Sequence, residues 1–141
     1  AGCQFLHRFV LFMPNSKLNI AVCSNAGWYT VPEYGINFPY GLDQSEININ
    51  TLNSSFSKKL YIHLAENDND PNASSLRHNE IVDNQQGLHR LARGRYFYLK
   101  AEEVALENSI YFNWIKTQEV PNVAHNASQM AEDAVKYLFP E

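Results

Sequence analysis

The sequence predicts an α/β fold in which three predominantly parallel strands are flanked by helices. Short apolar runs rich in β-branched residues alternate along the chain with longer segments whose apolar residues recur at helical spacing. Such alternation is typical of a parallel sheet, because each helix returns the chain to the edge at which the next strand starts. A length of 141 residues and a hydrophobic content of 45% are those of one globular domain.

Three segments have the composition of buried strands. Residues 18–25 are short, apolar and bounded by turn-forming residues on both sides. Residues 59–65 form a second run of this kind, which ends at an acidic, Asn-rich turn. Residues 111–120 are aromatic and β-branched and end at a proline, so they are expected to be the third strand.

Helical periodicity predicts helices before, between and after these strands. The first occupies the start of the chain and ends at Pro14. The others are expected at residues 44–52, 74–84, 86–107 and 128–139. In the longest of them Gly94 is a point of bending or division. Its three arginines are interpreted as a solvated polar face: Arg90, Arg93 and Arg95.

The segment at about residues 27–57 is rich in Gly, Pro, Tyr and Asn and is interpreted as a loop or lid inserted into a single domain, 1–141. Aromatic residues gather in its first half: Trp28, Tyr29, Tyr34, Phe38 and Tyr40. They form either a small satellite core that pins the loop or the wall of a substrate pocket. Trp28 and Tyr29 are the candidates for that wall.

Two residues with catalytic potential follow predicted strands. Asp68 lies just beyond the second strand and His125 a few residues beyond the third. Reactive groups gather at the carboxyl ends of parallel strands, where loops converge. An ionised Asp can hold one imidazole nitrogen while the other nitrogen takes a proton from a hydroxyl nucleophile. Asp70 is the competing acid, because a bulged turn could present either carboxylate.

Four segments of the chain resemble bacterial α/β-hydrolases of the esterase and polyhydroxybutyrate-depolymerase-like type. Residues 1–9 and 24–32 are similar to the region after the nucleophile turn of these enzymes, and residues 65–71 to their acid loop. Residues 86–94 are similar to the helix that follows the acid loop, and residues 123–126 with Met130 to the histidine turn. The resemblance covers most of the chain except the loop after Pro32. It implies a partial α/β-hydrolase fold.

The resemblance also implies a role for each candidate. In these enzymes the nucleophile serine stands in a G-x-S-x-G turn and is followed along the chain by the acid and then the histidine. Ala1 and Gly2 would fill the last two places of that turn, so the serine would directly precede Ala1. His125 would be the general base and then acid, Asp68 its orienting anion, and the Ala1 backbone amide part of the oxyanion hole.

The chain is therefore expected to be a fragment of a hydrolase that acts on an ester or related acyl bond. Without the serine it is expected to be inactive by itself. Its expected partners are a small-molecule ester or acyl substrate, together with the missing amino-terminal half of the fold or a second copy paired edge to edge. The alternative function is that of a non-catalytic ligand-binding or assembly module on the same half-fold. Within enzymes, a transferase with the same triad is a lesser alternative.

Other classes of function find no support in the sequence. Eleven basic and 15 acidic side chains, with no Lys/Arg block, make nucleic acid an unexpected partner. No apolar run approaches the ~20 residues of a membrane span. The spacing of Asp68, Asp70 and Asn72 opens like a calcium loop but fails at Ala73 and Asn79, where glycine and glutamate are required.

A zinc site and a cofactor are not expected either, because the histidines fall on separate elements and show no zinc-ligand spacing. Cys3 and Cys23 both lie in apolar runs. We expect them to be buried free thiols, without a disulfide.

Overall fold

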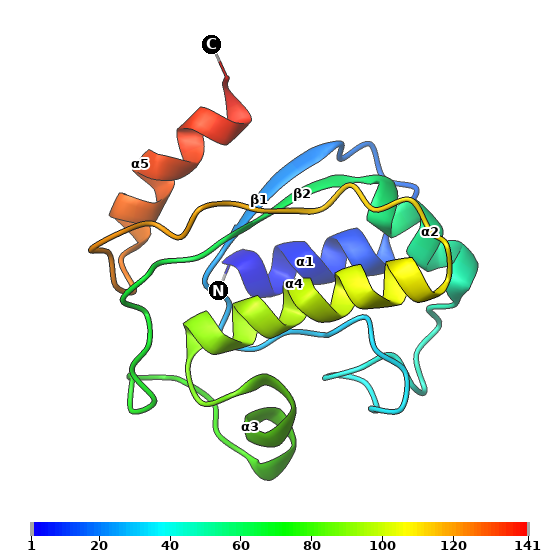
Figure 1. Cartoon of the computed structure of the whole chain (residues 1–141), viewed down its shortest axis with the longest axis horizontal. Coiled ribbons are helices and arrows are strands. Elements are labelled where there is room, and N and C mark those ends of the chain that lie inside the picture. The colour runs from blue at the N-terminus through cyan, green and yellow to red at the C-terminus, as the bar shows by residue number, and fades with distance from the viewer. Residues whose placement is uncertain (1, 141) are drawn as a thin grey trace.

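A computed structural model describes residues 2–140, in which a three-stranded parallel sheet has helices on both faces (Figure 1). This arrangement confirms the predicted fold class. In chain order the elements are α1 (Gly2–Phe12), β1 (Ile20–Ser24), α2 (Ile49–Ser57), β2 (Lys59–His63), α3 (Glu80–Gln86), α4 (Arg90–Glu107), β3 (Ile115–Lys116) and α5 (Ala127–Leu138).

The strands lie in the order β1-β2-β3, so sequence order and spatial order agree. β1 and β2 pair along their whole length, with Ile20 opposite Lys59. β3 is much shorter than predicted, since only Ile115 and Lys116 form a ladder with β2. Pairing is interrupted after Lys116 and resumes as one parallel bridge between Ala65 and Val120. That bridge becomes important for the site, because it joins the loops that follow β2 and β3.

Alternation along β2 separates the two faces of the sheet. Leu60 and Ile62 are fully buried in the main core, against α1 and α4. Tyr61 and His63 point to the opposite face, where both rings approach Tyr137 of α5. Successive side chains of a strand point to opposite faces, so one five-residue strand serves both layers. In Figure 1, α5 accordingly lies on one side of the sheet and α1 and α4 lie on the other.

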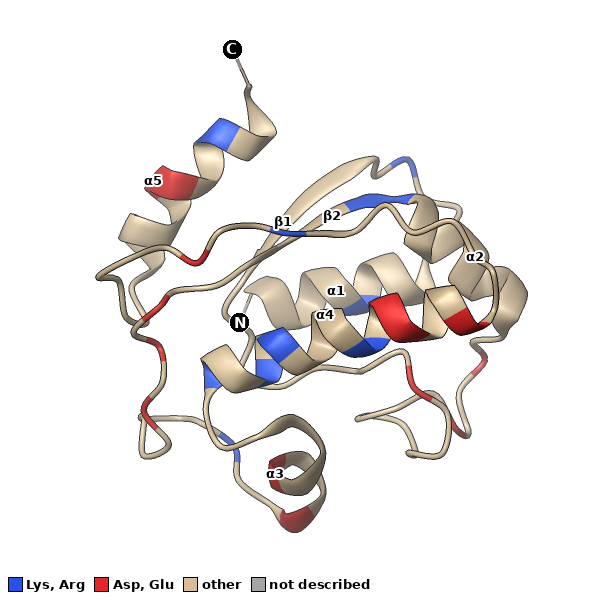
Figure 2. Cartoon of the chain, viewed as in Figure 1, with Lys and Arg blue, Asp and Glu red and all other residues tan. Residues whose placement is uncertain are grey.

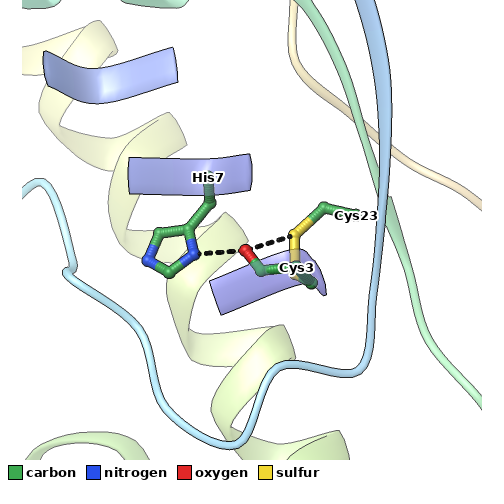
Figure 3. A group of neighbouring side chains, drawn as sticks. All are labelled: Cys3, His7 and Cys23. Atoms are coloured by element: carbon green, nitrogen blue, oxygen red, sulfur yellow. Dashed lines mark hydrogen bonds between the residues drawn. A yellow bond between two sulfur atoms is a disulfide. The ribbon is translucent and has the colours of Figure 1, made fainter. Parts of the chain in front are cut away.

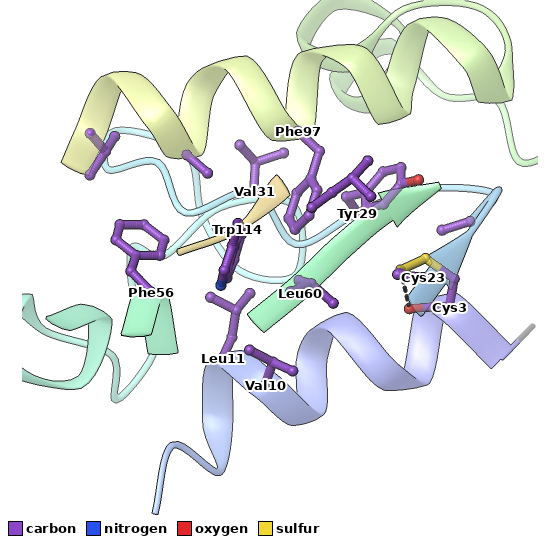
Figure 4. Close-up of a cluster of buried hydrophobic side chains, with 14 of the residues drawn as sticks. Cys3, Val10, Leu11, Cys23, Tyr29, Val31, Phe56, Leu60, Phe97 and Trp114 are labelled. Atoms are coloured by element: carbon purple, nitrogen blue, oxygen red, sulfur yellow. Dashed lines mark hydrogen bonds between the residues drawn. A yellow bond between two sulfur atoms is a disulfide. The ribbon is translucent and has the colours of Figure 1, made fainter. Parts of the chain in front are cut away.

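The core between the sheet and the α1/α4 layer is built largely from aromatic rings (Figure 4). Trp114 stacks on Phe97 with 5.4 Å between ring centroids, and meets Phe56 edge to face at 4.9 Å. Its indole N–H donates to the Ser55 carbonyl over 3.0 Å, which satisfies its one polar atom. Rings of this size supply most of the buried apolar area, and edge-to-face or offset stacking adds to it.

The expectation of free thiols is wrong, because Cys3 and Cys23 form a disulfide (Figures 3 and 4). Both residues are buried, as expected. The first turn of α1 packs against the end of β1 and brings the two Cα atoms to 4.6 Å, which is within bonding range. Their 20-residue separation in sequence carries no sign of this proximity.

Three of the predicted helices differ from expectation in their bounds or continuity. α2 starts at Ile49 rather than near residue 44. Its start is fixed by a capping box, which the side chains of Asn48 and Thr51 form. α3 is confined to Glu80–Gln86, after Asn79 caps its start. α4 runs unbroken through Gly94. Glycine is required at this position because a Cβ there would collide with Leu64.

Of the three α4 arginines expected to form a solvated face, only Arg95 is exposed. Arg90 and Arg93 are buried, and each of the three faces a carboxylate of another segment. Figure 2 shows basic residues in the first half of α4 and acidic residues in its second half. Positive charge near the start of a helix and negative charge near its end are unfavourable, because they oppose the helix dipole. The pairing of Arg93 with Asp83 at 2.8 Å, and of Arg95 with Glu119 at 2.6 Å, offsets that cost through tertiary contacts.

Candidate active site

Asp68 and His125 meet at the carboxyl end of the sheet. The Nδ1–H of His125 donates to Oδ2 of Asp68 over 2.7 Å. The loops that carry them are tied together by backbone hydrogen bonds: Glu66 N–H donates to the Val120 carbonyl at 3.0 Å, and Asn67 N–H to the Val123 carbonyl at 2.8 Å. These bonds continue the pairing of β2 with the chain beyond β3, so parallel strand order itself brings the two residues together.

Asp68 is held rigidly and is almost completely buried. Its backbone N–H donates to the Ala65 carbonyl, and its own carbonyl accepts from the Leu91 N–H at 3.0 Å, in the first turn of α4. Nη1 of the buried Arg90 lies 3.8 Å from Asp68 Oδ1. A buried carboxylate needs such compensation, since removal from water strongly disfavours an isolated charge. The side chain therefore has one oxygen for His125 and a cation near the other.

Asp70, the competing acid, takes a different role. Its side chain is exposed, and Oδ1 accepts from the Asn72 N–H at 2.8 Å. An Asp that bonds its own backbone two residues on is a common turn-forming arrangement. The structure therefore brings Asp68, and not Asp70, to His125.

The His125 side chain is partly exposed at the edge of a pocket. About half of the side chain is exposed, and within residues 2–140 only Nδ1 has a hydrogen-bond partner. Because a carboxylate can only accept, Nδ1 carries a proton, and in the neutral ring Nε2 carries the lone pair. The residue lines a pocket of about 740 Å³, together with Gly2 and Phe5 of α1, Ser24 of β1 and Met130 of α5. An imidazole placed in this way can accept a proton from a hydroxyl group inside the pocket.

Trp28 and Tyr29 lie away from this pocket. Trp28 packs with Tyr40 in a small separate cluster, and its ring lies between the guanidinium groups of Arg8 and Arg77 at 5.0 and 4.9 Å. Tyr29 is fully buried and stacks on Phe97 at 4.5 Å. Neither lines the pocket that contains His125. Their substrate-pocket role stays a prediction, while their burial agrees with the alternative of residues that pin the loop. The Ala1 amide lies outside the described residues.

One cluster of potential metal ligands occurs among the described residues: Cys3, His7 and Cys23 (Figure 3). The two sulfur atoms are joined in the disulfide. His7 Nδ1–H donates to the Cys3 carbonyl at 2.7 Å, and Nε2 accepts from the Thr30 N–H at 2.9 Å. Burial lowers the pKa of His7 from 6.5 to about 3. Every potential ligand atom of the cluster is thus already engaged, so as built it has none to offer a metal.

Sequence reasoning missed a second histidine–carboxylate pair. His63, the last residue of β2, bonds Asp133 of α5 through Nε2 at 2.7 Å and Ser24 of β1 through Nδ1 at 2.6 Å. A histidine at the end of a predicted strand is the only local sign of this group. Its partners lie 39 and 70 residues away in sequence, so no motif could have joined them.

Among the described residues, no helix is long and apolar enough to cross a membrane. No protein-family model matches the chain. No curated protein matches it either.

Two solved structures resemble the chain closely. Poly(aspartic acid) hydrolase-1 from Sphingomonas sp. KT-1 is 38% identical, with a TM-score of 0.90 over 95% of this chain and 50% of that one. The poly(3-hydroxybutyrate) depolymerase LpqC from Bordetella parapertussis is 27% identical, with a TM-score of 0.88 over 97% of this chain and 45% of that one. The chain thus has a hydrolase-like α/β fold and spans about half the length of each hydrolase that it resembles.

Proposed function

We propose that the chain is the carboxy-terminal part of a serine hydrolase that cleaves an ester or related acyl bond, with His125 and Asp68 as two members of its triad. The observation that carries the proposal is the 2.7 Å bond between His125 Nδ1 and the buried Asp68 carboxylate, in a histidine that lines a pocket and whose Nε2 has no partner among the described residues. The similarity to two hydrolases that act on acyl-linked polymers supports the reaction class.

In this reaction Nε2 of His125 takes the proton of the serine hydroxyl as its oxygen attacks the acyl carbon. The resulting imidazolium is stabilised by the Asp68 carboxylate, which also keeps the ring in the required tautomer. The imidazolium then gives its proton to the leaving group, and an acyl-serine remains. A water molecule, deprotonated by the same Nε2, attacks the acyl-serine and releases the acid as the serine regains its proton. Arg90 stabilises the buried Asp68 throughout, since it lies 3.8 Å from the oxygen that His125 does not use.

The nucleophile in this proposal is a serine directly before Ala1. Gly2 and Cys3, in the first turn of α1, line the same pocket as His125. A serine on the turn that leads into α1 would therefore stand at the mouth of that pocket, beside Nε2. The amino end of a helix also favours the negative charge that develops on the acyl oxygen. The 141-residue chain alone has no hydrolase activity in this proposal, because loss of the triad nucleophile costs on the order of a millionfold in turnover.

The test uses the protein extended upstream of Ala1. A fluorophosphonate probe should label one serine directly before Ala1, and an activated acyl ester should be hydrolysed. His125→Ala should abolish both, and Asp68→Asn should reduce turnover by about four orders of magnitude because the imidazole loses its tautomer control. Asp70→Asn is the matched control, and its turnover should stay within about twofold of the parent.

Equal losses in the Asp68→Asn and Asp70→Asn variants would contradict the assignment of the acid. Absence of labelling, combined with tight binding of a ligand by the extended protein, would instead support a non-catalytic binding module. Transfer of the acyl group to an alcohol in preference to water would identify a transferase that uses the same triad.

We also propose that the remaining part of the fold docks beside β1. The pairing order leaves the outer edge of β1 without a partner strand among the described residues. Beside it lie apolar side chains that are largely exposed, with Phe5 at 67% and Val135 at 51%. An open edge of this kind attracts another strand. When the chain is co-expressed with the upstream segment, light scattering should show a one-to-one complex of the two. A homodimer of the chain in the presence of that segment would contradict the proposal that the remaining part of the fold occupies the β1 edge.

A further inference from the structure

Three side chains from three different elements form a continuous polar connection on the face of the sheet that α5 covers. The Ser24 hydroxyl of β1 lies 2.6 Å from Nδ1 of His63 on β2, and Nε2 of His63 lies 2.7 Å from Oδ2 of Asp133 on α5. The His63 side chain has no solvent exposure. The connection therefore crosses from the edge strand to the helix that covers the sheet, through an imidazole excluded from water.

The chemistry of the three groups sets the direction of each bond. Because the Asp133 carboxylate can only accept, His63 carries its proton on Nε2. Nδ1 then accepts the proton of the Ser24 hydroxyl, so both ring nitrogens are satisfied in the neutral imidazole. Partial burial acts to raise the pKa of Asp133, but bonds from His63 and Lys136 outweigh it and hold the pKa below the usual value. A hydrogen bond to a charged acceptor is about twice as strong as a neutral one.

Few other buried contacts hold α5 in place. Of its 12 residues only Met130 and Ala134 are buried, while Asp133 and Tyr137 are half-buried and the rest are exposed. These contacts and the packing of the Tyr137 ring against Tyr61 and His63 are not directional, so they leave the helix some freedom to rotate about its axis or slide along the sheet. A charged, directional bond to a rigid strand removes that freedom. The His63–Asp133 bond is thus a principal determinant of where α5 sits.

α5 anchors one side of His125, and the backbone bond between Asn67 and Val123 anchors the other. His125 directly precedes Asn126, whose side chain caps α5 by accepting from the Gln129 N–H at 2.9 Å. The backbone at His125 is therefore continuous with the first turn of the helix. Asp133 is six residues beyond the first residue of α5. At a rise of about 1.5 Å per residue this is about 9 Å along a rigid rod, so a shift at Asp133 is transmitted to His125.

We propose that His63 is a positioning residue which, through Asp133, holds α5 where the His125 imidazole reaches Asp68. The catalytic consequence rests on the proposed function, whereas the positioning itself does not. The effect is structural preorganisation. A displacement of about 1 Å in a catalytic base can cost on the order of a hundredfold in rate.

Ser24, His63 and Asp133 are also the residue types of a catalytic triad, with a serine nucleophile, a base and an acid. The burial of His63 excludes that role. A catalytic imidazole must give its proton to a leaving group beside the serine, so the nitrogen nearest the serine has to reach the substrate. The His63 ring has no exposed surface. It can hold the Ser24 hydroxyl but cannot reach a molecule in the pocket.

The test is made on the 141-residue chain by NMR, with the downfield Nδ1 proton of His125 as the probe. In Asp133→Ala the exchange of this proton with water should accelerate at least tenfold, as the His125–Asp68 bond opens more often. His63→Gln should have the same effect. Glu132→Ala is the matched control, because it removes an acidic, exposed residue next to Asp133 on the same helix and should leave exchange within twofold.

Unchanged exchange in Asp133→Ala, with the core amide shifts of α1 and α4 retained, would overturn the proposal. Labelling of Ser24 by a fluorophosphonate would also overturn it, because Ser24 would then be a nucleophile. In the extended protein, Asp133→Ala should lower kcat by at least tenfold with KM within threefold, and Glu132→Ala should change neither. A tenfold effect on exchange without any hydrolase activity in the extended parent would refute the proposed function while leaving the positioning role intact.

Discussion

His7 provides a direct test of how burial controls a titrating group in this fold. Its ring lies between α1 and the main core, packed against Tyr29 and Phe97. One nitrogen donates to the Cys3 carbonyl and the other accepts from the Thr30 N–H, so only the neutral ring satisfies both bonds. Burial lowers the pKa from 6.5 to about 3; the bond to Cys3 opposes this shift, and the nearby Arg8 adds to it.

The sign of the pH effect follows from proton linkage. Between pH 6.5 and 3 the unfolded chain binds a proton at His7 that the folded chain does not bind. The contribution of the neutral ring to stability is therefore fully present above pH 6.5 and is lost as the pH falls towards 3. The slope in this window is about 1.4 kcal/mol per pH unit. Between pH 7 and pH 4.5 the loss due to His7 alone is about 2–3 kcal/mol.

The assay compares urea unfolding of the parent and His7→Gln at pH 7 and pH 4.5. Glutamine can donate to one carbonyl and accept from one N–H but does not titrate. Every other titrating group is common to both proteins and cancels in the difference. The free energy of unfolding of the parent should fall by about 2–3 kcal/mol more than that of the variant. Equal losses would refute the inference that His7 is buried in its neutral form.

Three further predictions concern stability. Gly94→Ala should destabilise the chain by about 1–3 kcal/mol in urea unfolding, because the new Cβ collides with Leu64. This loss should exceed the gain from the better helix propensity of Ala. An increase in stability would contradict the close packing at Gly94. Reduction of the Cys3–Cys23 disulfide should cost about 3 kcal/mol, as expected for closure of a loop of this length. A Cys3→Ser/Cys23→Ser variant that unfolds at the same urea concentration as the parent would exclude the bond. Asn126→Ala should cost about 1 kcal/mol at the start of α5 and speed amide exchange in its first turn, while unaltered exchange there would count against the cap.

Much of the fold could be predicted because its strands and helices are encoded by local patterns. The apolar runs around Val22 and Ile62 are buried strands that begin within two residues of the predicted positions. The same reasoning placed Asp68 and His125 at strand ends, and the parallel order of the sheet joins them. The choice between Asp68 and Asp70 remained open in the sequence, because both carboxylates lie in one turn. Only the fold shows which of them is turned inward.

Other features depend on partners that are distant in sequence. The third strand was predicted as ten residues but pairs over only two, since β-propensity does not reveal where a partner strand lies. Arg90 and Arg93 looked like surface residues because charge alone does not report burial. Their carboxylate partners come from other segments of the chain. The thiols of Cys3 and Cys23 are likewise joined only by the packing of α1 on β1.

The sequence by itself determined the class of the fold and the order of its elements, and it placed His125 and the candidate acids Asp68 and Asp70 beyond strand ends. These properties follow from hydrophobic periodicity and from the rule that parallel strands end at one edge. Tertiary structure alone decided the disulfide, the pairing of the α4 arginines and the connection from Ser24 through His63 to Asp133. The physical reason is that a buried polar group is defined by the partner that satisfies it, and in this chain that partner is supplied from a different element.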